Sequence, residues 1–408
     1  MKEIQTQVCI VGAGAAGLWA AAACAEQGVE TLVLEKTRRT GTKILSSGGS
    51  RCNLTTTLDS RDTARQFGAG QNFITPALKA LSPQAVRAHF EGLGVATKEE
   101  AEFQKVFPVS DSALEVRDAM ERAARAKGAR FLIDQGVCSI EPFEGGWVAH
   151  TKSLRVLCRC LLICSGGRSY PKTGTTGDGY EWLAGLGLEI VEPVPALVPL
   201  ASPADWIREL SGVAVDGELR IGKVRRRRPV LFTHRGISGP AAMDLSEIIA
   251  RGGTGEARLD LLPELSWEVL REQFVEAAGR SGSPRIASCI PLPRRVVEMV
   301  TQQADLGEVN PQFNQLSKAS RHRLIDTLKG LRIPISGTLG FDKAEVTAGG
   351  LSLREVERRT MQVHKAPGLY VFGEVLDLTG PIGGFNFQAA FATAQMAARA
   401  VIDTKNNG

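Results

Sequence analysis

One stretch near the N-terminus, Val8 to Glu35, restricts the possible folds of this chain most strongly. It reads VCIVGAGAAGLWAAAACAEQGVETLVLE, in which an apolar run meets Gly12-x-Gly14-x-x-Gly17 and an alanine-rich segment leads to a second apolar run. This order predicts a strand, a tight turn, a helix and a second strand that ends at an acidic residue. The glycines let backbone N–H groups approach a pyrophosphate at the helix N-terminus, and Glu35 is placed to bind a ribose. The stretch therefore predicts one dinucleotide-binding half of a Rossmann-like α/β domain.

The same stretch superficially imitates a secretory signal peptide, because Lys2 precedes the mostly apolar residues from Val8 to Ala25. Signal peptides rarely carry glycines at turn spacing, and cleavage after Ala25 would remove the first strand of the domain. No other segment approaches the roughly 20 apolar residues that a membrane span needs. The eight cysteines contain no Cys-x-x-Cys pair and no spacing typical of a secreted disulfide framework. We therefore expect a cytoplasmic protein.

The length of 408 residues predicts two or three domains. The nucleotide-binding α/β domain is expected to comprise residues 1–192 and 343–408, because strand and helix patterns at both ends of the chain fit one sheet. Residues 193–262 and 331–342 read as short strands and turns, and residues 263–330 read as helices. A formal net charge of +5 is compatible with an anionic cofactor or with nucleic acid and requires neither.

Capping signals predict where several helices begin. Ser82 is followed by proline, which is typical of an N-cap and a first helical position. Ser112 and Glu115 have the spacing of a capping box. Two later helices are expected to open at Pro293 and at Ser320.

A second group of cofactor-binding segments follows the first motif. The loop after Glu35 is rich in glycine, serine and basic residues, and its N–H groups from Ser46 to Gly49 are expected to line a phosphate or the edge of an isoalloxazine ring. The apolar strand over Leu154–Cys164 ends at Ser165-Gly-Gly, as expected for a parallel strand whose C-terminal end faces a cofactor.

The C-terminal part of the chain supplies the partner of the first motif, in the stretches GLYVFGEVLD and GGFNFQ. A strand is expected to end at Glu374, and a glycine pair introduces an apolar helix over Phe387–Ile402. The N-terminus of such a helix carries partial positive charge, which stabilises a reduced flavin. We expect Asn386 to cap this helix and Glu374 to reach ribityl hydroxyls. Pairing of the two halves predicts FAD as the cofactor.

Eight stretches, in order along the chain, resemble the BaiN/RdsA (YhiN-type) family of NAD(P)/FAD-dependent oxidoreductases. They are GAGAAG, KILSSGGSRCN, FPVSDSA, TGTTGDGY, PALVPL, LFTHRGISGP, AEVTAGG and GEVLDLTGPIGGFNFQ. The resemblance implies a two-dinucleotide-binding-domain flavoprotein in which the FAD-binding domain is interrupted by a β-barrel-like domain that carries a helical insert. The chain departs from the family pattern at Ser50, where glycine is frequent, and at Pro381-Ile382, where an aromatic or glycine-rich variant is common.

The motifs and the resemblance together define a set of expected cofactor-binding residues. These are Gly12, Gly14, Ala15, Ala16, Gly17, Glu35, Lys36, Lys43, Gly48, Gly49, Arg51, Cys52, Asn53, Val137, Ser165, Gly166, Gly167, Gly373, Glu374, Gly383, Gly384, Asn386, Phe387 and Gln388. No metal site is expected, because Cys158, Cys160 and Cys164 alternate along an apparent buried strand, where cysteine behaves as a small hydrophobic residue.

The family resemblance implies reduction of an activated C=C bond. The substrate would be uridine in large-subunit ribosomal RNA, reduced to dihydrouridine, or an unsaturated ketone such as a steroid, and we favour the RNA. NAD(P)H is the expected electron donor. The chain has no second GxGxxG motif, so the donor would bind transiently at the flavin face, or another reductant would replace it. An FAD-dependent oxidase of an amine or aminoketone and a non-catalytic, flavin-stabilised RNA-binding module remain alternatives.

Catalytic and substrate-binding residues are less strongly indicated. Cys52 and His234 are candidate proton donors, with packing of Cys52 and a structural role for His234 as alternatives. Arg235 is a candidate anchor for an anionic substrate. Arg225–Arg228, in the run KVRRRR, are candidate RNA contacts beside an expected hairpin, although exposed turns are often basic. The sequence leaves the oligomeric state open.

Overall fold

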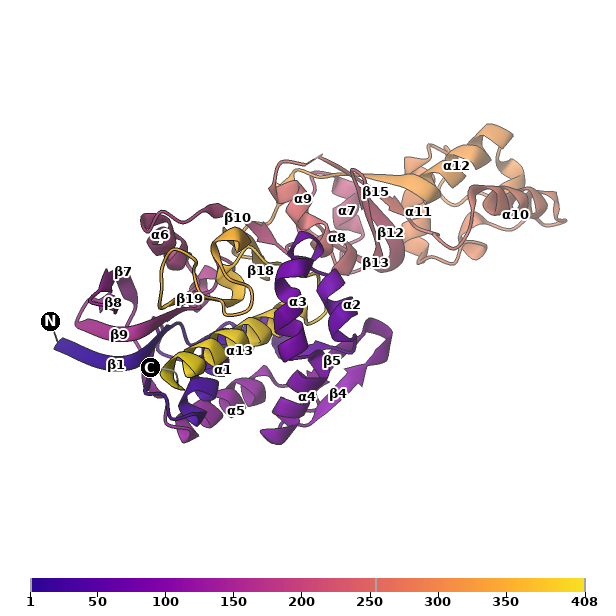
Figure 1. Ribbon diagram of the computed structural model, residues 1–408. Helices are drawn as coiled ribbons and strands as arrows, with labels where there is room; N and C mark the ends of the chain where they lie inside the picture. The colour runs from indigo at the N-terminus through magenta and orange to yellow at the C-terminus, as the bar shows by residue number, and fades with distance from the viewer. Residues whose placement is uncertain (1, 254, 407–408) are drawn as a thin grey trace. The chain divides into compact units, whose positions relative to one another are not determined.

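The computed structural model describes residues 2–253 and 255–406, which belong to two compact units. The first unit is Met1–Val194 with Glu345–Gly408, and the second is Pro195–Ala344. Figure 1 shows the elements of each unit along the chain. The divisions fall within two residues of the boundaries expected from the sequence. The separation of a helical insert from a barrel-like domain stays a prediction, because strands and helices of the second unit share one hydrophobic core.

A parallel sheet forms the centre of the first unit. Its strands, in spatial order, are β6 (Arg130–Leu132), β2 (Thr31–Leu34), β1 (Lys2–Val11) and β9 (Leu154–Ile163), with β19 (Leu369–Val371) also paired to β9. β8 (Gly146–Thr151) and β7 (Val137–Phe143) extend the sheet as an antiparallel pair. Because β1 pairs with β9 along its whole length, β8 and β19 share the opposite edge of β9. This is the Rossmann-like arrangement that the first motif predicts.

The central strands are buried on both faces, as expected for a parallel sheet covered by other elements. All four residues of β2 are buried, and so are Cys158, Cys160 and Cys164 in and after β9. Within the described ranges, no group of three or more His, Cys, Asp or Glu is arranged to hold a metal ion. The burial of these cysteines places them in the core of the first unit, where cysteine behaves as a small hydrophobic residue.

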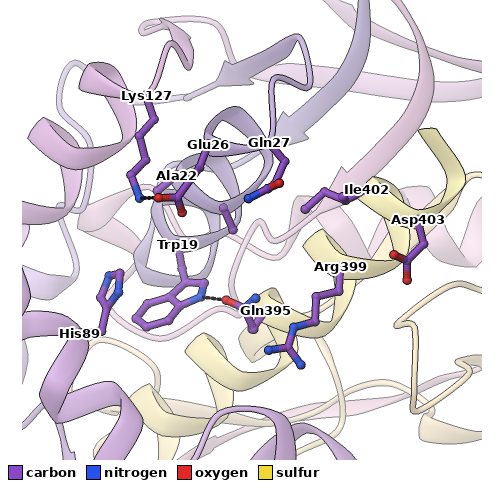
Figure 2. Close-up of a pocket in the computed structure, with 11 residues that line it drawn as sticks. Trp19, Ala22, Glu26, Gln27, His89, Lys127, Gln395, Arg399, Ile402 and Asp403 are labelled. Carbon is purple, nitrogen blue, oxygen red and sulfur yellow. Dashed lines mark hydrogen bonds and ion pairs between the residues drawn. The ribbon is translucent and has the colours of Figure 1, made fainter. Parts of the chain in front are cut away.

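Two apolar helices, α1 (Ala15–Glu26) and α13 (Phe385–Asn406), lie side by side against the sheet (Figure 1). Trp19 connects them, because its indole N–H donates to Oε1 of Gln395 at 2.8 Å and its ring stacks on Phe391 at 5.0 Å. Figure 2 shows this bond beside the ion pair of Lys127 with Glu26, at 2.7 Å. A cavity of about 310 Å³ is lined by Trp19, Glu26, Lys127 and Gln395 among others, and its lining includes none of the expected cofactor-binding residues. The first and last helices of the chain thus form one packed pair.

The remaining elements of the first unit follow the chain around this core. They are β3 (Thr55–Thr56), α2 (Ser60–Arg65), α3 (Gln71–Ala80), α4 (Pro83–Gly92), β4 (Thr97–Glu100), β5 (Lys105–Pro108), α5 (Ala113–Ala126), α6 (Asp178–Gly185), β10 (Ile190–Ala196) and β18 (Val346–Leu351). β3, β5 and β4 form a small antiparallel sheet, and β10 pairs with β18.

An antiparallel sheet forms the centre of the second unit. In spatial order it contains β16 (Leu331–Pro334), β15 (Glu256–Asp260), β12 (Ala214–Ile221), β13 (Val224–Thr233), β14 (Gly236–Ser238), β11 (Leu200–Ala201) and β17 (Gly337–Thr338). Its helices are α7 (Asp205–Glu209), α8 (Pro240–Asp244), α9 (Ser246–Ala250), α10 (Trp267–Gly279), α11 (Arg294–Gln303) and α12 (Lys318–Gly330). Buried and exposed residues alternate along β12, so one face of this sheet packs on the core and the other faces water.

Several expected starts of elements are confirmed and others shift. Ser82 caps α4 through the N–H of Ala85, at 3.1 Å, and α11 begins directly after Pro293. α12 begins earlier than expected, because its N-cap is Ser317, whose Oγ accepts from the N–H of Ser320 at 3.0 Å. The basic run is not beside a hairpin but forms the start of strand β13 within one. None of the described helices combines the length and apolar character that crossing a membrane requires.

The capping box at the start of α5 is only half formed. Ser112 Oγ accepts from the N–H of Glu115 at 3.4 Å, whereas the Glu115 carboxylate binds the hydroxyl of Ser110 instead of returning to the cap. The expected helix is present, with one of the two bonds that define the motif.

Candidate cofactor-binding site

The glycines of the first motif form an open turn at the N-terminus of α1. Gly12 has φ +106°, and a Cβ on Gly17 would lie 1.9 Å from the carbonyl oxygen of Gly12, so neither position accepts a larger residue without a shift. Gly14 is the N-cap of α1, and a Cβ there would meet nothing within 4 Å. No side chain caps this helix, and its first turn contains no acidic residue. Free N–H donors therefore face open space, which fits a pyrophosphate.

Glu35, at the end of β2, holds the turn in place. Its Oε2 accepts from the N–H of Ala13 at 2.8 Å, and its Oε1 accepts from both the N–H and the hydroxyl of Thr37 at 2.8 Å each. A carboxylate oxygen has two lone pairs, so Oε2 retains capacity for one more donor. The structure thus adds a positioning role for Glu35, and its expected ribose contact stays a prediction.

A cavity of about 410 Å³ adjoins the residue after Glu35. Lys36 lines it, with its ammonium on Asp178 at 2.7 Å and on Thr176 at 2.6 Å. Val137, another expected cofactor residue, and the indole of Trp182 also line it. An aromatic wall with a few polar groups is suited to a flat heterocyclic base.

An ion pair between Lys43 and Glu374 joins the two ends of the chain, with a separation of 2.6 Å. The hydroxyl of Ser169 bridges the pair, since it accepts from Lys43 Nζ at 2.6 Å and donates to Glu374 Oε1 at 3.0 Å. The N–H of Thr347 also donates to Glu374 Oε1, at 2.9 Å. Both charged side chains are less than a quarter exposed, so water screens them less than a surface pair.

This network contains two residues that the sequence motifs did not identify, Ser169 and Thr347. The stretch AEVTAGG, which contains Thr347, was the one available signal. Glu374 binds Lys43 in the structure, and its expected contact with ribityl hydroxyls stays a prediction.

The loop after Lys43 has an unusual backbone. Gly48, Gly49, Ser50 and Cys52 all have positive φ, between 54° and 69°, which is costly for the two residues that are not glycine. Such strain persists only where the surroundings enforce it, and it is frequent at ligand sites. The loop that the sequence assigns to a cofactor is therefore rigidly shaped.

Asn53, at the end of this loop, ties it to the C-terminal glycine pair. In the amide orientation that satisfies both ends, its oxygen accepts from the N–H of Gly384 and its nitrogen donates to the carbonyl of Thr55, both at 2.9 Å. A Cβ on Gly384 would lie 2.4 Å from that carbonyl, so the close approach requires glycine. Segments more than 300 residues apart in sequence thus meet at one point.

The start of α13 differs from the sequence prediction. Asn386 lies inside the helix rather than at its cap, and its amide exchanges two bonds of 2.9 Å with the N–H and the carbonyl of Gly380. The prediction that Asn386 caps the helix is therefore wrong; it instead fixes the loop before the helix. Gln388 is fully buried, accepting from the hydroxyl of Thr55 at 2.7 Å and donating to the carbonyl of Leu81 at 2.8 Å.

Two buried hydroxyl groups in this region have no hydrogen-bond partner within the described ranges, Ser165 Oγ and Tyr180 OH. Ser165 follows β9 and lies against the Gly12 turn. Burial, and then the negative charge of Glu374, raise the pKa of Tyr180, so its hydroxyl stays protonated as a donor. Buried polar groups are normally paired, so these orphan hydroxyls fit a site completed by a polar ligand.

The structure also shows the surroundings of four other expected residues, Arg51, Cys52, His234 and Arg235. The Arg51 guanidinium binds Asp111 at 2.8 Å and also Glu100, and lies over the ring of Phe107 at 4.1 Å. Cys52 is fully buried, and burial raises its pKa to about 12, an environment that favours a packing role. His234 and Arg235 are exposed in the turn between β13 and β14 of the second unit. The catalytic roles of Cys52 and His234 stay predictions.

Known proteins resemble this chain over its whole length. It is 32% identical over 404 residues to the ribosomal RNA dihydrouridine synthase of Escherichia coli, and the alignment covers 98% of both chains. It is 28% identical over 408 residues to the 3-dehydro-bile acid delta(4,6)-reductase of Clostridium scindens, covering 97% of this chain and 98% of that protein. The solved structure of a 3-ketosteroid-delta4-(5alpha)-dehydrogenase from Rhodococcus jostii matches with a TM-score of 0.52 at 16% identity, over 98% of each chain. This last likeness concerns the fold alone.

The resemblance seen in the motifs is confirmed by these relatives, and the Rossmann-like fold class is confirmed as well. A family model described as the HI0933-like protein Rossmann domain matches residues 6–400. That match includes both halves of the glycine-rich site and the whole second unit. This chain therefore belongs to the HI0933-like Rossmann family.

Proposed function

We propose that this protein is an FAD-dependent oxidoreductase that reduces a C=C bond, with uridine in ribosomal RNA as substrate and dihydrouridine as product. The observation that carries the proposal is the full-length similarity, at 32% identity, to a protein named ribosomal RNA dihydrouridine synthase. A relative named as a bile acid delta(4,6)-reductase points to the same class of bond. An RNA substrate of this kind would place the protein in the cytoplasm.

The residues present fit FAD. The open N-terminus of α1 at Gly14 would hold the pyrophosphate, and Glu35 would hold the adenosine ribose. The cavity beside Lys36 would receive the adenine, and the orphan hydroxyl groups of Ser165 and Tyr180 would find partners on the ligand. Bound FAD would supply the two-electron chemistry of the reaction.

The chain itself would orient the substrate and deliver a proton, because reduction of a C=C bond adds a hydride and a proton. His234 is exposed and able to meet a substrate, whereas Cys52 is buried with its thiol firmly protonated. Rates of flavin reoxidation by substrate in Cys52→Ala and His234→Ala test both residues. A wild-type rate in either variant removes that residue as the donor.

The electron donor is proposed to be NADH or NADPH, bound transiently. The deciding experiment is anaerobic reduction of the holoenzyme with each nucleotide, followed by addition of ribosomal RNA that lacks dihydrouridine. The flavin absorbance should bleach with the nucleotide and return with the RNA. Reduction of the flavin by an amine or aminoketone without the nucleotide, followed by fast reoxidation by oxygen with peroxide formed, would instead indicate an oxidase of that substrate. Flavin that stays oxidised with every donor would indicate a non-catalytic binding module.

A further inference from the structure

Four arginines lie in register across the sheet of the second unit. Arg220 on β12 is directly opposite Arg225 on β13 and, on its other side, opposite Arg258 on β15. Arg258 is in turn opposite Arg332 on β16. Residues in direct register share one face of a sheet, so the four side chains form a row that we call the arginine row. Neighbouring strands are about 4.8 Å apart, so the row spans about 14 Å.

The arginine row faces solvent. All four residues are exposed, while the residues that flank them on β12 and β15, such as Leu219 and Leu259, are fully buried. The sequence run Lys223–Arg228 contains only one member of the row. The other three come from separate parts of the sequence, which explains why the run alone was an ambiguous signal.

Acidic residues only partly neutralise the row. Arg225 lies 3.5 Å from Glu218, and Arg258 lies 3.0 Å from Glu256. Among the residues that the structure covers, no carboxylate lies within ion-pair distance of Arg220 or Arg332. The β12–β13 hairpin over residues 214–233 carries six basic residues against two acidic ones. A chain with a net charge of only +5 thus concentrates positive charge on this part of its surface.

Such a row is unfavourable for folding by itself, since like charges directly opposite each other on a sheet repel. Arg220 has an arginine on each side. A polyanion placed over the row would remove that repulsion and gain contact with evenly spaced guanidinium groups, which bind phosphate in a bidentate manner.

We propose that the arginine row binds the phosphate backbone of RNA. The inference rests on the proposed RNA substrate and specifies where the second unit would hold it. The contacts are to phosphates, so they position the RNA and carry no sequence preference.

The experiment measures binding of a fluorescein-labelled ribosomal RNA fragment to the full-length holoenzyme by fluorescence anisotropy, from roughly 50 to 300 mM salt. Four phosphate contacts predict a slope of log affinity against log salt of about −3 from this row. The double variant Arg220→Glu with Arg332→Glu should reduce the slope by at least about 1.4 and weaken binding at least about tenfold at 0.1 M salt. The control reverses two exposed arginines, Arg271 in α10 and Arg280 directly after it, as Arg271→Glu with Arg280→Glu. It should change affinity less than about twofold, because it changes the net charge by the same amount away from the row.

A neutral variant separates binding from folding. Arg220→Thr should leave the melting temperature unchanged or raise it, because it removes two repulsive neighbours, while RNA binding falls. A lower melting temperature with unchanged RNA binding would show that the row is structural and would overturn the inference.

The outcomes also separate this inference from the proposed function. If wild-type protein binds the RNA and both row variants bind it equally well, the row is not the contact, although the substrate proposal survives. If wild-type protein does not bind RNA at all, the RNA substrate itself is wrong. Weaker binding of the row variants to phosphatidylserine vesicles, with RNA binding unchanged, would assign the row to an anionic membrane surface and overturn the proposal.

Discussion

Gly14 and Gly17 lie three residues apart, yet a side chain would meet very different surroundings at the two positions. A side chain at Gly17 would collide with the backbone of Gly12, whereas a side chain at Gly14 would point into open space. We propose that the first glycine keeps space free for a ligand, whereas the second permits the packing of a helix on a strand.

This difference predicts opposite effects of two alanine substitutions. Gly14→Ala should lower the free energy of unfolding by less than about 1 kcal/mol, because it changes only the N-cap residue of α1. The purified variant should nevertheless contain little FAD, because the methyl group would occupy the space for the pyrophosphate. Gly17→Ala should cost at least about 2–3 kcal/mol through overpacking. Thermal melting and flavin absorbance of the purified proteins measure both quantities. Normal flavin content in Gly14→Ala would contradict the assignment of this turn to the pyrophosphate.

The cysteines offer a second test at the scale of single residues. Cys138 and Cys289 are exposed and the other six are buried; burial raises the pKa of Cys24 and Cys52 to about 12 and that of Cys160 to about 11. A thiol with a raised pKa stays protonated and unreactive, so Ellman's reagent at pH 8 should modify two thiols rapidly in native protein and all eight after denaturation. Rapid modification of Cys52 would contradict its burial and revive it as a proton donor.

The same shifts fix the sign of the pH dependence of stability. Unfolded thiols ionise near pH 9, whereas the buried thiols of Cys24 and Cys52 stay neutral to about pH 12. Their contribution to stability is therefore complete below pH 9 and is lost as the pH rises from 9 towards 12. Urea denaturation at pH 8 and pH 10.5 should show lower stability at the higher pH.

Single residues also show what could not be predicted from the sequence. The turn glycines and Glu35 were predictable because their partners lie within one strand–helix–strand unit. The ion pair of Lys43 with Glu374 was not, because nothing local to either residue indicates a partner 331 positions away. The prediction that Asn386 caps its own helix used only its position before the apolar run. The Asn386 side chain instead binds the backbone of Gly380, in a loop whose geometry the sequence does not reveal.

At the scale of elements, one buried amide ties the start of α13 to two other segments of the first unit. Gln388 bonds the hydroxyl of Thr55 on β3 and the carbonyl of Leu81, which lies between α3 and α4. Two separate segments are thus fixed relative to the start of α13, next to the Gly384 turn.

Replacement of this amide by an apolar side chain should be costly. Gln388→Met keeps the shape but leaves two buried polar groups unpaired, so it should lower the free energy of unfolding by about 3 kcal/mol. Adding Thr55→Val removes one of the unpaired groups and should recover about 1 kcal/mol. Urea denaturation of the two variants and of Thr55→Val alone completes the cycle. Strict additivity of the two substitutions would show that the bond does not couple the elements.

Elements with strong periodicity or clear caps were predictable, such as β9 and α4, because local pattern and tertiary burial agree there. β13 was only partly predictable, since its first half is one valine followed by four arginines and has no apolar alternation. The first half of β13 is a strand because it pairs with β12, and such pairing depends on two segments rather than on the local sequence of one.

At the scale of the whole molecule, the two units differ in how the chain forms them. The second unit is one continuous segment with its own hydrophobic core, whereas the first is assembled from both ends of the chain. The two segments of the first unit meet close to the points where the second unit interrupts them, because a Cβ on Gly349 of β18 would touch the carbonyl of Glu192 on β10.

This organisation predicts that each unit can exist without the other. Residues 195–344 expressed alone should unfold in one cooperative transition and bind no flavin. Residues 1–194 joined to 345–408 by a short glycine-serine linker should retain FAD. Circular dichroism melting and flavin absorbance measure the two results. Loss of FAD from the joined protein would indicate that the second unit is required to complete the cofactor site.

The ion pair of Lys43 with Glu374 has a consequence for how the protein is made. Lys43 leaves the ribosome well before its carboxylate partner, which is translated 331 residues later. The continuous second unit can therefore fold on the nascent chain while the glycine turn and its loop still lack half of their contacts. Cofactor loading becomes a post-translational event, and a polypeptide truncated before Glu374 would be a folded second unit attached to an N-terminal segment unable to retain a flavin.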